Sequence, residues 1–188
     1  MTDEPQTTSL APGFLVSVPQ LQDPNFDHAV VFLIAHGEEG AFGLTVNRRA
    51  DVDLEDVLDE LELPAADHAN GEVLLGGPVE PGRGFLLHGG DTPLPGAETV
   101  GDGIHLSGEP ETLRLAVAGA TPFRLCLGYA GWGPGQLEAE FTQGAWLTAP
   151  AAPRYLFELP VNQVWERVLR DIGIDPATIR LSDDGPAN

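Results

Sequence analysis

Lysine is absent from this sequence of 188 residues, and all nine basic residues are arginines. A chain without lysine has no phosphate-loop lysine, no Schiff-base lysine and no lysine general base. The 29 acidic residues outnumber the basic ones and give a formal net charge of −20 at pH 7. Because a duplex-binding surface needs clustered cations to displace counterions, this balance argues against direct binding of nucleic acid.

Cysteine and long apolar runs are also scarce. The single cysteine, Cys126, excludes an intramolecular disulfide and a thiolate cluster for zinc. The longest apolar stretch, residues 29–35, is too short to cross a bilayer, and the acidic N-terminus lacks the apolar core of a signal peptide. We therefore expect a cytoplasmic protein with no membrane segment, and the sequence indicates no metal and no cofactor.

The hydrophobic pattern predicts one mixed α/β domain. Apolar residues make up 42% of the chain, and 23 glycines and 17 prolines favour a turn-rich fold over a helix bundle. The run at 29–34 is typical of a strand covered on both faces, and it is expected to form an antiparallel hairpin with 42–46. The expected strands are 13–18, 29–34, 42–46, 73–75, 84–88, 104–106, 123–129 and 145–147.

The clearest helix has apolar residues at i, i+3, i+4 and i+7, namely Leu54, Val57, Leu58 and Leu61. Asp51 or Asp53 is available as its cap, and Pro64 ends it. Further helices are expected from Glu109 onward, at 136–141 and at 161–172, whereas 89–103 is expected to be a loop. The expected organisation is a flexible tail at 1–12, one domain at 13–180 and a second flexible tail at 181–188.

The glycine-rich segment that begins at Gly128 is the most distinctive candidate site. Gly128, Gly131 and Gly135 would let a backbone approach a ligand closely, and Trp132 could supply a stacking wall. The alternative is a tight strand-to-helix crossover in which glycine takes a positive φ and Trp132 packs in the core. The sequence favours this alternative, because a phosphate loop needs a lysine that does not follow here.

Two histidines and a pair of polar residues are candidates for acid–base chemistry. Gln136 and Glu140 share one helix face, where they could orient a ligand or act as a base, or where Gln136 could bond with the amides of the first turn. His36 and His88 each end an expected strand at a glycine turn, which is a common place for acid–base residues. Without further ligands at suitable spacing they do not indicate zinc, and an imidazole bonded to a nearby carbonyl is the alternative.

The remaining candidates lie in turns and at strand ends. Gly76, Gly77 and Pro78 join two apolar runs, and they could line a pocket or simply form a turn. Asn47 could join a polar cluster or cap a turn through side-chain bonds to the backbone. Cys126 lies within an apolar run, where a buried and inert thiol is expected.

Several ordered motifs run through residues 13–175. They are Gly13-x-Leu15, Pro19-x-Leu21-x-Asp23-Pro24-x-Phe26, Val30-Val31, His36, Gly40-Ala41-x-Gly43, Asn47, Gly76-Gly77-Pro78-Val79, Gly84-Phe85-x-Leu87-His88, Gly128-Tyr129-Ala130-Gly131-Trp132, Gly135-Gln136-Leu137-Glu138-x-Glu140, Trp146-Leu147 and Trp165. Together they resemble the motifs of the AlgH/YqgE family of bacterial proteins.

This resemblance implies a single α/β domain whose mixed sheet bends toward a partial barrel, flanked by about four helices. No enzymatic activity is established for the family, so the resemblance leaves the function open. One branch is named for an effect on alginate production and is often labelled a transcriptional regulator. Many members have Cys and Glu just before the first-motif histidine, where this chain has Ile34 and Ala35, so a thiol-based role there is in doubt. Arg49 replaces a proline that is frequent in the family.

The sequence leaves three functional hypotheses. The leading one is a non-enzymatic binding or regulatory protein that holds an unknown small molecule or protein partner. Its pocket would lie where the His36 turn, the Gly76 turn and residues 128–140 converge, because α/β folds bind ligands at strand ends. The second is a hydrolase or transferase that uses His36 or His88 with Glu140. The third is a transcriptional regulator that acts through a protein partner rather than by direct contact with DNA.

Overall fold

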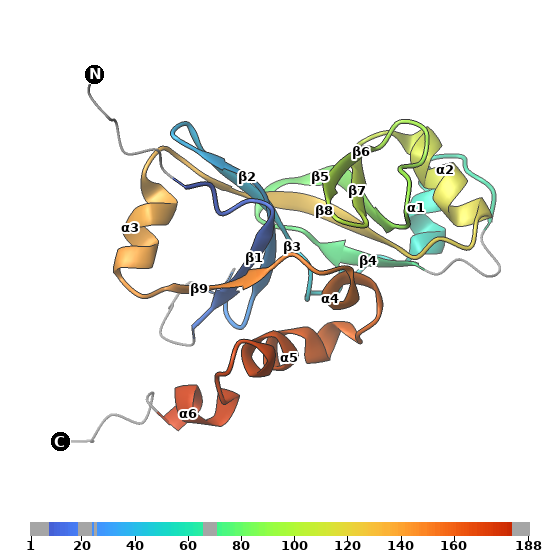
Figure 1. Cartoon of the computed structure of the whole chain (residues 1–188). Helices are drawn as coiled ribbons and strands as arrows, with labels where there is room; N and C mark the ends of the chain where they lie inside the picture. The colour runs from blue at the N-terminus through green and yellow to red at the C-terminus, as the bar shows by residue number, and fades with distance from the viewer. Residues whose placement is uncertain (1–7, 19–23, 25, 66–70, 182–188) are drawn as a thin grey trace.

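The computed structural model describes residues 8–18, 24, 26–65 and 71–181 (Figure 1). Residues 1–7 and 182–188 of the two expected tails, and most of the motif quoted at 19–26, lie outside this description. Residues 8–12 are described, and two of them contact a strand. The Ser9 hydroxyl donates to the His36 carbonyl oxygen at 3.2 Å, and the Leu10 N–H donates to the His36 ring at 3.1 Å.

Nine strands of the described chain form one curled sheet, a half-barrel in an α+β domain, as the family resemblance implies. The strand order is β6-β7-β5-β8-β3-β2-β1-β9, and β4 pairs with β8 beside this path. All pairings are antiparallel except β4 with β8. The strands are β1 (Gly13–Ser17), β2 (Val30–Gly37), β3 (Gly40–Thr45), β4 (Gly71–Leu75), β5 (Val79–Gly89), β6 (Glu98–Gly101), β7 (Ile104–Ser107), β8 (Phe123–Trp132) and β9 (Trp146–Pro150).

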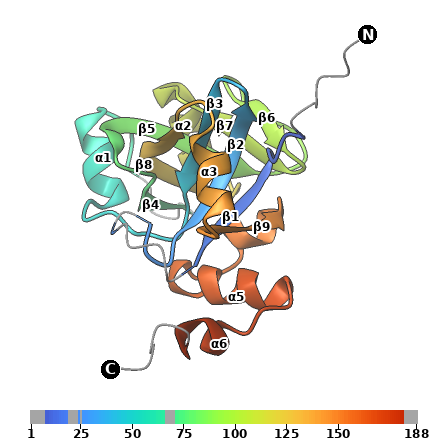
Figure 2. The ribbon, with the colours of Figure 1, turned by 90° about the vertical axis from the view of Figure 1, so that its left-hand side faces the viewer.

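The helices lie around this sheet in three places (Figures 1 and 2). α1 and α2 lie at one end, α3 lies at the opposite end, and α5 and α6 lie along one side. Their bounds are α1 (Leu54–Glu60), α2 (Pro110–Ala118), α3 (Gln136–Thr142), α4 (Pro153–Phe157), α5 (Val164–Asp171) and α6 (Pro176–Leu181). The long strand β8 runs from the end of the sheet near α1 and α2 to the end near α3. Residues that contact α3 therefore lie far from those that contact α1 and α2.

Several features differ from the sequence prediction. β5 begins at Val79 instead of residue 84, and β2 extends past residue 34 to Gly37. The expected loop at 89–103 contains β6, which is a short edge strand paired with β7 and carries no alternating apolar pattern. β8 continues beyond residue 129 to Trp132, because its last residues pair with β3. Six α-helices are described instead of about four. The additional α4 and α6 start at prolines and have only five and six residues, which is too short for a helical periodicity.

The buried core divides into three clusters that follow the helices. The largest joins the sheet to α4 and α5, and a second joins β1, β2 and β8 to α3. The third lies beneath α1 and α2 and includes Leu58, Leu113 and Leu125. In α1 only Leu58 is fully buried, and Leu61, which follows the helix, is 41% exposed. The apolar stripe of the first helix is therefore only partly covered by the rest of the described chain.

Candidate functional site

The Gly76-Gly77 turn and the glycine-rich segment that begins at Gly128 lie side by side. Their backbones pack against each other and leave no space for a ligand between them. A Cβ on Gly77, which has φ +156°, would overlap with the backbone of Tyr129 and Ala130. A Cβ on Gly128, which has φ +73°, would press on the Gly77 carbonyl oxygen. These glycines therefore allow close approach of two backbone segments of the same chain. Gly77 and Pro78 also line a cleft of about 210 Å³ with Thr45 and Arg48.

Glu140 holds together the end of β8 and the start of β9. One of its carboxylate oxygens accepts hydrogen bonds from the indole N–H of Trp132 at 2.9 Å and of Trp146 at 2.7 Å. The other oxygen accepts from the Gln136 side chain at 3.2 Å, and the Gln136 oxygen accepts from the backbone N–H of Gly133 at 3.1 Å. Both indoles are buried, so the structure bears out the interpretation of Trp132 as a core residue. The contacts of Glu140 are those of a structural carboxylate.

The remaining candidate glycines of this segment have local backbone roles. Gly135 has φ +74° and directly precedes α3, so it turns the chain from the strand into the helix. Gly131 lies within β8 and pairs with Phe42 of β3. The segment after Gly128 is thus the last part of a strand followed by a tight turn.

His36 lies beside α3 with both ring nitrogens occupied. Its Nδ1 accepts from the Leu10 N–H, so Nε2 carries the proton and donates to Glu138 at 2.7 Å. The imidazole side chain is only 2% exposed. The pKa of Glu138 lies below its ordinary value, first because its own backbone N–H donates to the carboxylate and then because His36 does. His36 also lines an open depression of about 440 Å³ along the β2–β3 hairpin.

His88 lies at the other end of β8, where it pairs with Phe123 in the ladder. The ring is fully buried, donates from Nδ1 to the Gly89 carbonyl oxygen at 2.8 Å and accepts from the Leu94 N–H at 3.2 Å. It packs on His105 at a centroid distance of 4.8 Å. Burial lowers the pKa of His88, the Gly89 bond opposes this shift, and His105 adds to it. Because Nε2 accepts the Leu94 N–H, the ring is in its neutral form in this arrangement.

A pH titration of the imidazole resonances by NMR tests this description of His88. We expect a midpoint below 6.5, the ordinary value for histidine, because a protonated Nε2 would oppose the Leu94 N–H. Below pH 6.5 the histidine of the unfolded chain binds a proton, whereas buried His88 in the folded chain binds it only at lower pH. The contribution of His88 to the free energy of unfolding is therefore present above pH 6.5 and is lost as the pH falls. A midpoint at or above 6.5 would contradict the buried neutral ring.

Asn47 fixes the start of β2. Its side-chain oxygen accepts from the Val30 N–H at 2.8 Å, and its amide donates to the His28 carbonyl oxygen at 2.7 Å. Asn47 therefore replaces backbone bonds where the strand begins.

The structure does not bring the predicted site residues to one cavity. His36 lies with α3, Gly77 lies against the middle of β8, and His88 lies beside the first residue of β8. The carboxylate that contacts His36 is Glu138 and not Glu140. Within the described residues, no group of three or more His, Cys, Asp or Glu side chains is placed to hold a metal ion.

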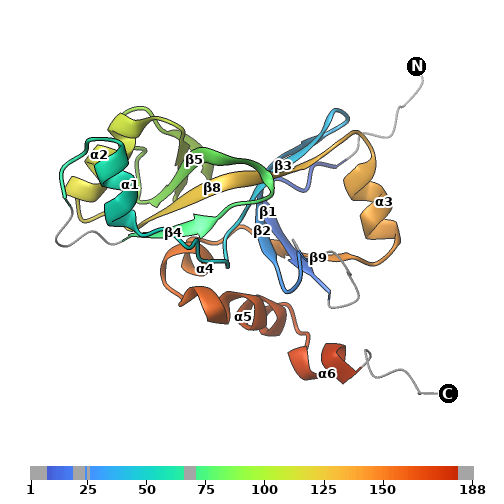
Figure 3. The ribbon, with the colours of Figure 1, turned by 180° about the vertical axis from the view of Figure 1, so that it is seen from behind.

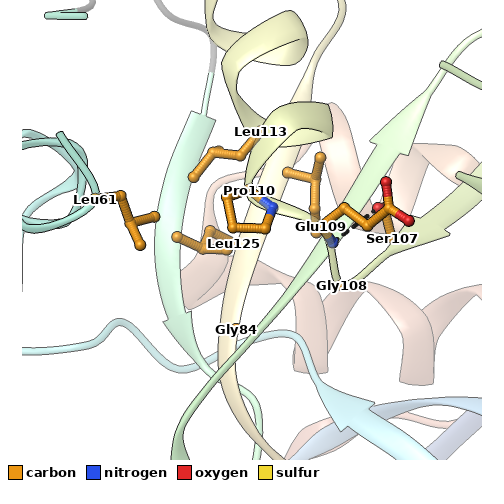
Figure 4. A pocket seen from close by; sticks show the side chains of 9 residues that line it. Leu61, Gly84, Ser107, Gly108, Glu109, Pro110, Leu113 and Leu125 are labelled. Carbon is orange, nitrogen blue, oxygen red and sulfur yellow. Dashed lines mark hydrogen bonds between the residues drawn. The ribbon is translucent and has the colours of Figure 1, made fainter. Parts of the chain in front are cut away.

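Sequence reasoning missed an apolar groove between α1 and α2. Figure 4 shows Leu61 on the α1 side, Pro110 and Leu113 on the α2 side, and Leu125 of β8 between them. Two depressions of about 110 and 300 Å³ share Leu61, Gly84 and Leu125, so they form one continuous surface. We call it the α1–α2 groove, and its lining residues are Val52, Asp56, Val57, Glu60, Leu61, Pro81, Gly82, Gly84, Leu86, Ser107, Gly108, Glu109, Pro110, Leu113, Leu125 and Leu127.

The α1–α2 groove combines an apolar interior with an acidic rim. Leu125 of β8 lines both depressions, and Leu127 lines the depression beside α1; Figure 3 shows the positions of the two helices from behind. The carboxylates among the lining residues are Asp56 and Glu60 of α1, four residues apart, and Glu109 at the start of α2. One feature of the sequence belongs to this groove, namely the apolar stripe of the first helix. Leu61 completes this stripe, but only the fold reveals that the described residues cover it in part.

Comparison with known proteins identifies the family. Residues 14–177 match the model of the family described as AlgH-like. A UPF0301 protein of Myxococcus xanthus is 42% identical over 173 residues, which cover 91% of this chain and 95% of the relative. The chain belongs to the AlgH-like family. Among solved structures, that of the AlgH protein from Pseudomonas aeruginosa is 35% identical, with a TM-score of 0.75 and coverage of 98% of both chains.

A second solved structure, of a protein from Corynebacterium diphtheriae, is 24% identical with a TM-score of 0.71, covers 94% of this chain and 92% of its own, and supports the fold alone. The AlgH-like assignment confirms the resemblance seen in the sequence motifs. It brings no established catalytic or regulatory function, because the family is uncharacterised. Among the described residues, no helix is both long and apolar enough to cross a membrane.

The only cysteine of this AlgH-like chain is poorly suited to thiol chemistry. Cys126 is fully buried in β8, and burial raises the pKa of its thiol to about 12. A thiol of this kind is a poor nucleophile at neutral pH, because the thiolate is the reactive form.

Proposed function

We propose that this AlgH-like protein is a non-enzymatic binding protein, and that the α1–α2 groove holds apolar side chains of a protein partner. The observation that carries the proposal is the apolar lining of the groove, in which Leu61 is 41% exposed beside the buried Leu125 and the partly buried Leu127 of the sheet. An apolar cleft with a few polar groups at its edge is the usual form of a binding site on a folded domain.

The chemistry of the other candidate residues supports binding over catalysis. Both ring nitrogens of His36 and of His88 are engaged by groups of the protein itself. Glu140 accepts three hydrogen bonds from side chains of its own domain. A general acid or base must reach the proton that it transfers, and in this arrangement each of these groups is hydrogen-bonded within its own domain.

The size of the groove favours anchor side chains over a large cofactor. Its two depressions, of about 110 and 300 Å³, lie at or below the lower end of the range of ligand pockets, which span about 300–1,000 Å³. Two helices flanking an apolar floor suit the insertion of a partner segment whose anchors lie on one face. A regulatory role, if the protein has one, would act through such a partner.

Substituting Gly84 by phenylalanine tests the proposal. An added Cβ at this position meets only the Leu125 side chain, at 3.5 Å, so a Phe side chain would start at the groove floor without a backbone clash. The probe is a synthetic amphipathic peptide of about 15 residues, with leucine on one helical face and glutamine elsewhere. We expect the wild type to bind it and Gly84→Phe to bind about tenfold more weakly or not at all.

The matched control is Gly37→Phe. Gly37 lies in β2 at the opposite hairpin, and a Cβ there meets no atom within 4 Å. This variant adds the same ring and is expected to bind the peptide as the wild type does. Equal binding by the wild type and Gly84→Phe, or no change in the amide NMR signals of groove residues on adding peptide, would overturn the proposal.

A further inference from the structure

We infer that the partner segment of the α1–α2 groove is basic. The inference rests on the proposed function and adds the charge of the partner to it. The carboxylates of Asp56, Glu60 and Glu109 line the groove, and no basic side chain is among its described lining residues. A segment with apolar anchors and flanking lysines or arginines would match both the interior and the rim.

Asp56 and Glu60 are arranged so that a cation would relieve a repulsion. They are four residues apart on the seven-residue helix α1, on the side that faces the groove. Like charges at this spacing destabilise a helix, and a cationic side chain between them would replace repulsion by attraction. Because the rim is exposed to solvent, this attraction is expected to weaken as salt is added.

The two ends of this chain lack the composition expected of the segment that binds in the α1–α2 groove. Residues 1–7 and 182–188 contain acidic residues and no arginine, and Met1 is their only large apolar residue. They offer neither a row of anchors nor the opposite charge. Self-insertion of either end would therefore bring further carboxylates to the acidic rim.

A second copy of the chain also fits poorly. Many of its arginines are already paired with its own carboxylates, for example Arg83 with Glu80, Arg114 with Glu111, and Arg154 with Asp171. Two copies with a formal charge of −20 each repel one another. A separate basic protein segment is the occupant whose charge complements the groove.

Three peptides that differ only in charge test the inference. They share the leucine face described above and carry glutamine, lysine or glutamate at all other positions. At low salt we expect the lysine peptide to bind the wild type about tenfold more tightly than the glutamine peptide, and the glutamate peptide to bind most weakly. At about 0.5 M salt the advantage of lysine is expected to shrink to about twofold.

Two double variants with the same change in net charge distinguish the effect of the rim carboxylates on peptide binding from the effect of the total protein charge. Asp56→Asn/Glu60→Gln neutralises the rim, and Glu38→Gln/Glu39→Gln neutralises two exposed acids of the β2–β3 hairpin. We expect the rim variant to reduce the lysine preference to about threefold or less, and the hairpin variant to leave it close to tenfold.

The outcomes distinguish this inference from the proposed function. Equal binding of all three peptides, with Gly84→Phe still blocking them, would overturn the basic partner and leave the groove as the binding site. Equal loss of preference in the rim and hairpin variants, or unchanged binding of the lysine peptide to Gly84→Phe, would show attraction to the whole acidic surface and overturn the inference. Binding of no peptide would overturn the proposed function itself.

Discussion

Replacing Glu140 by leucine is expected to lower the free energy of unfolding by about 3 kcal/mol. The substitution leaves two buried indole N–H groups, those of Trp132 and Trp146, without an acceptor. An orphaned buried donor costs about 1–3 kcal/mol, and two are left here. Domains of this size have about 5–15 kcal/mol of stability, so the loss is large. Denaturant unfolding measures it, and the indole N–H proton signals are expected to move at the same time.

Glu140→Gln provides the control for this prediction. The amide keeps one oxygen that can accept from both indoles, so we expect a loss of about 1 kcal/mol. A Glu140→Leu protein that unfolds within about 0.5 kcal/mol of the wild type would show that the two indole bonds do not stabilise the fold. In that case Glu140 would again be a candidate acid–base residue.

Gly77→Ala is expected to destabilise the fold by at least about 3 kcal/mol. Gly77 combines φ +156° with a Cβ direction that runs into the backbone of Tyr129 and Ala130. Backbone atoms cannot rotate away as a flexible side chain can, so β8 itself would have to shift. The expected results are a lower denaturant midpoint and a smaller yield of folded protein.

Gly82→Ala is the matched control for the glycine prediction. A Cβ on Gly82 meets no atom within 4 Å, and its φ lies outside the left-handed region. We expect its unfolding free energy to match that of the wild type within about 0.5 kcal/mol. If Gly77→Ala were as stable as Gly82→Ala, the Gly76-Gly77-Pro78 motif would need an explanation other than close backbone packing.

Strong local patterns made much of the fold predictable. The buried run that forms β2 and its hairpin with β3 could be predicted from a continuous apolar stretch followed by a glycine turn. The inward face of α5 could be predicted from its periodicity, and it is buried at Val164, Trp165, Val168 and Leu169. The edge strand β6 could not, because its residues are largely exposed and it is held by its pairing with β7.

The candidate site was less predictable, because its contacts are long-range. The spacing of Gln136 and Glu140 correctly placed them on one helix face. The acceptor role of Glu140 depends on an indole from β9, and the burial of His88 depends on His105 from β7. The α1–α2 groove depends on the partial exposure of Leu61 in the described structure. A sequence pattern shows which residues are apolar and does not show which of them remain uncovered.

The most direct test of the account is to locate the bound peptide. Nuclear Overhauser effects between the leucine methyls of the lysine peptide and the methyls of this protein report which side chains are in contact. We expect contacts with Leu61, Leu113 and Leu125, on both sides and at the floor of the groove. Contacts confined to another surface, such as the β2–β3 hairpin, would contradict the account.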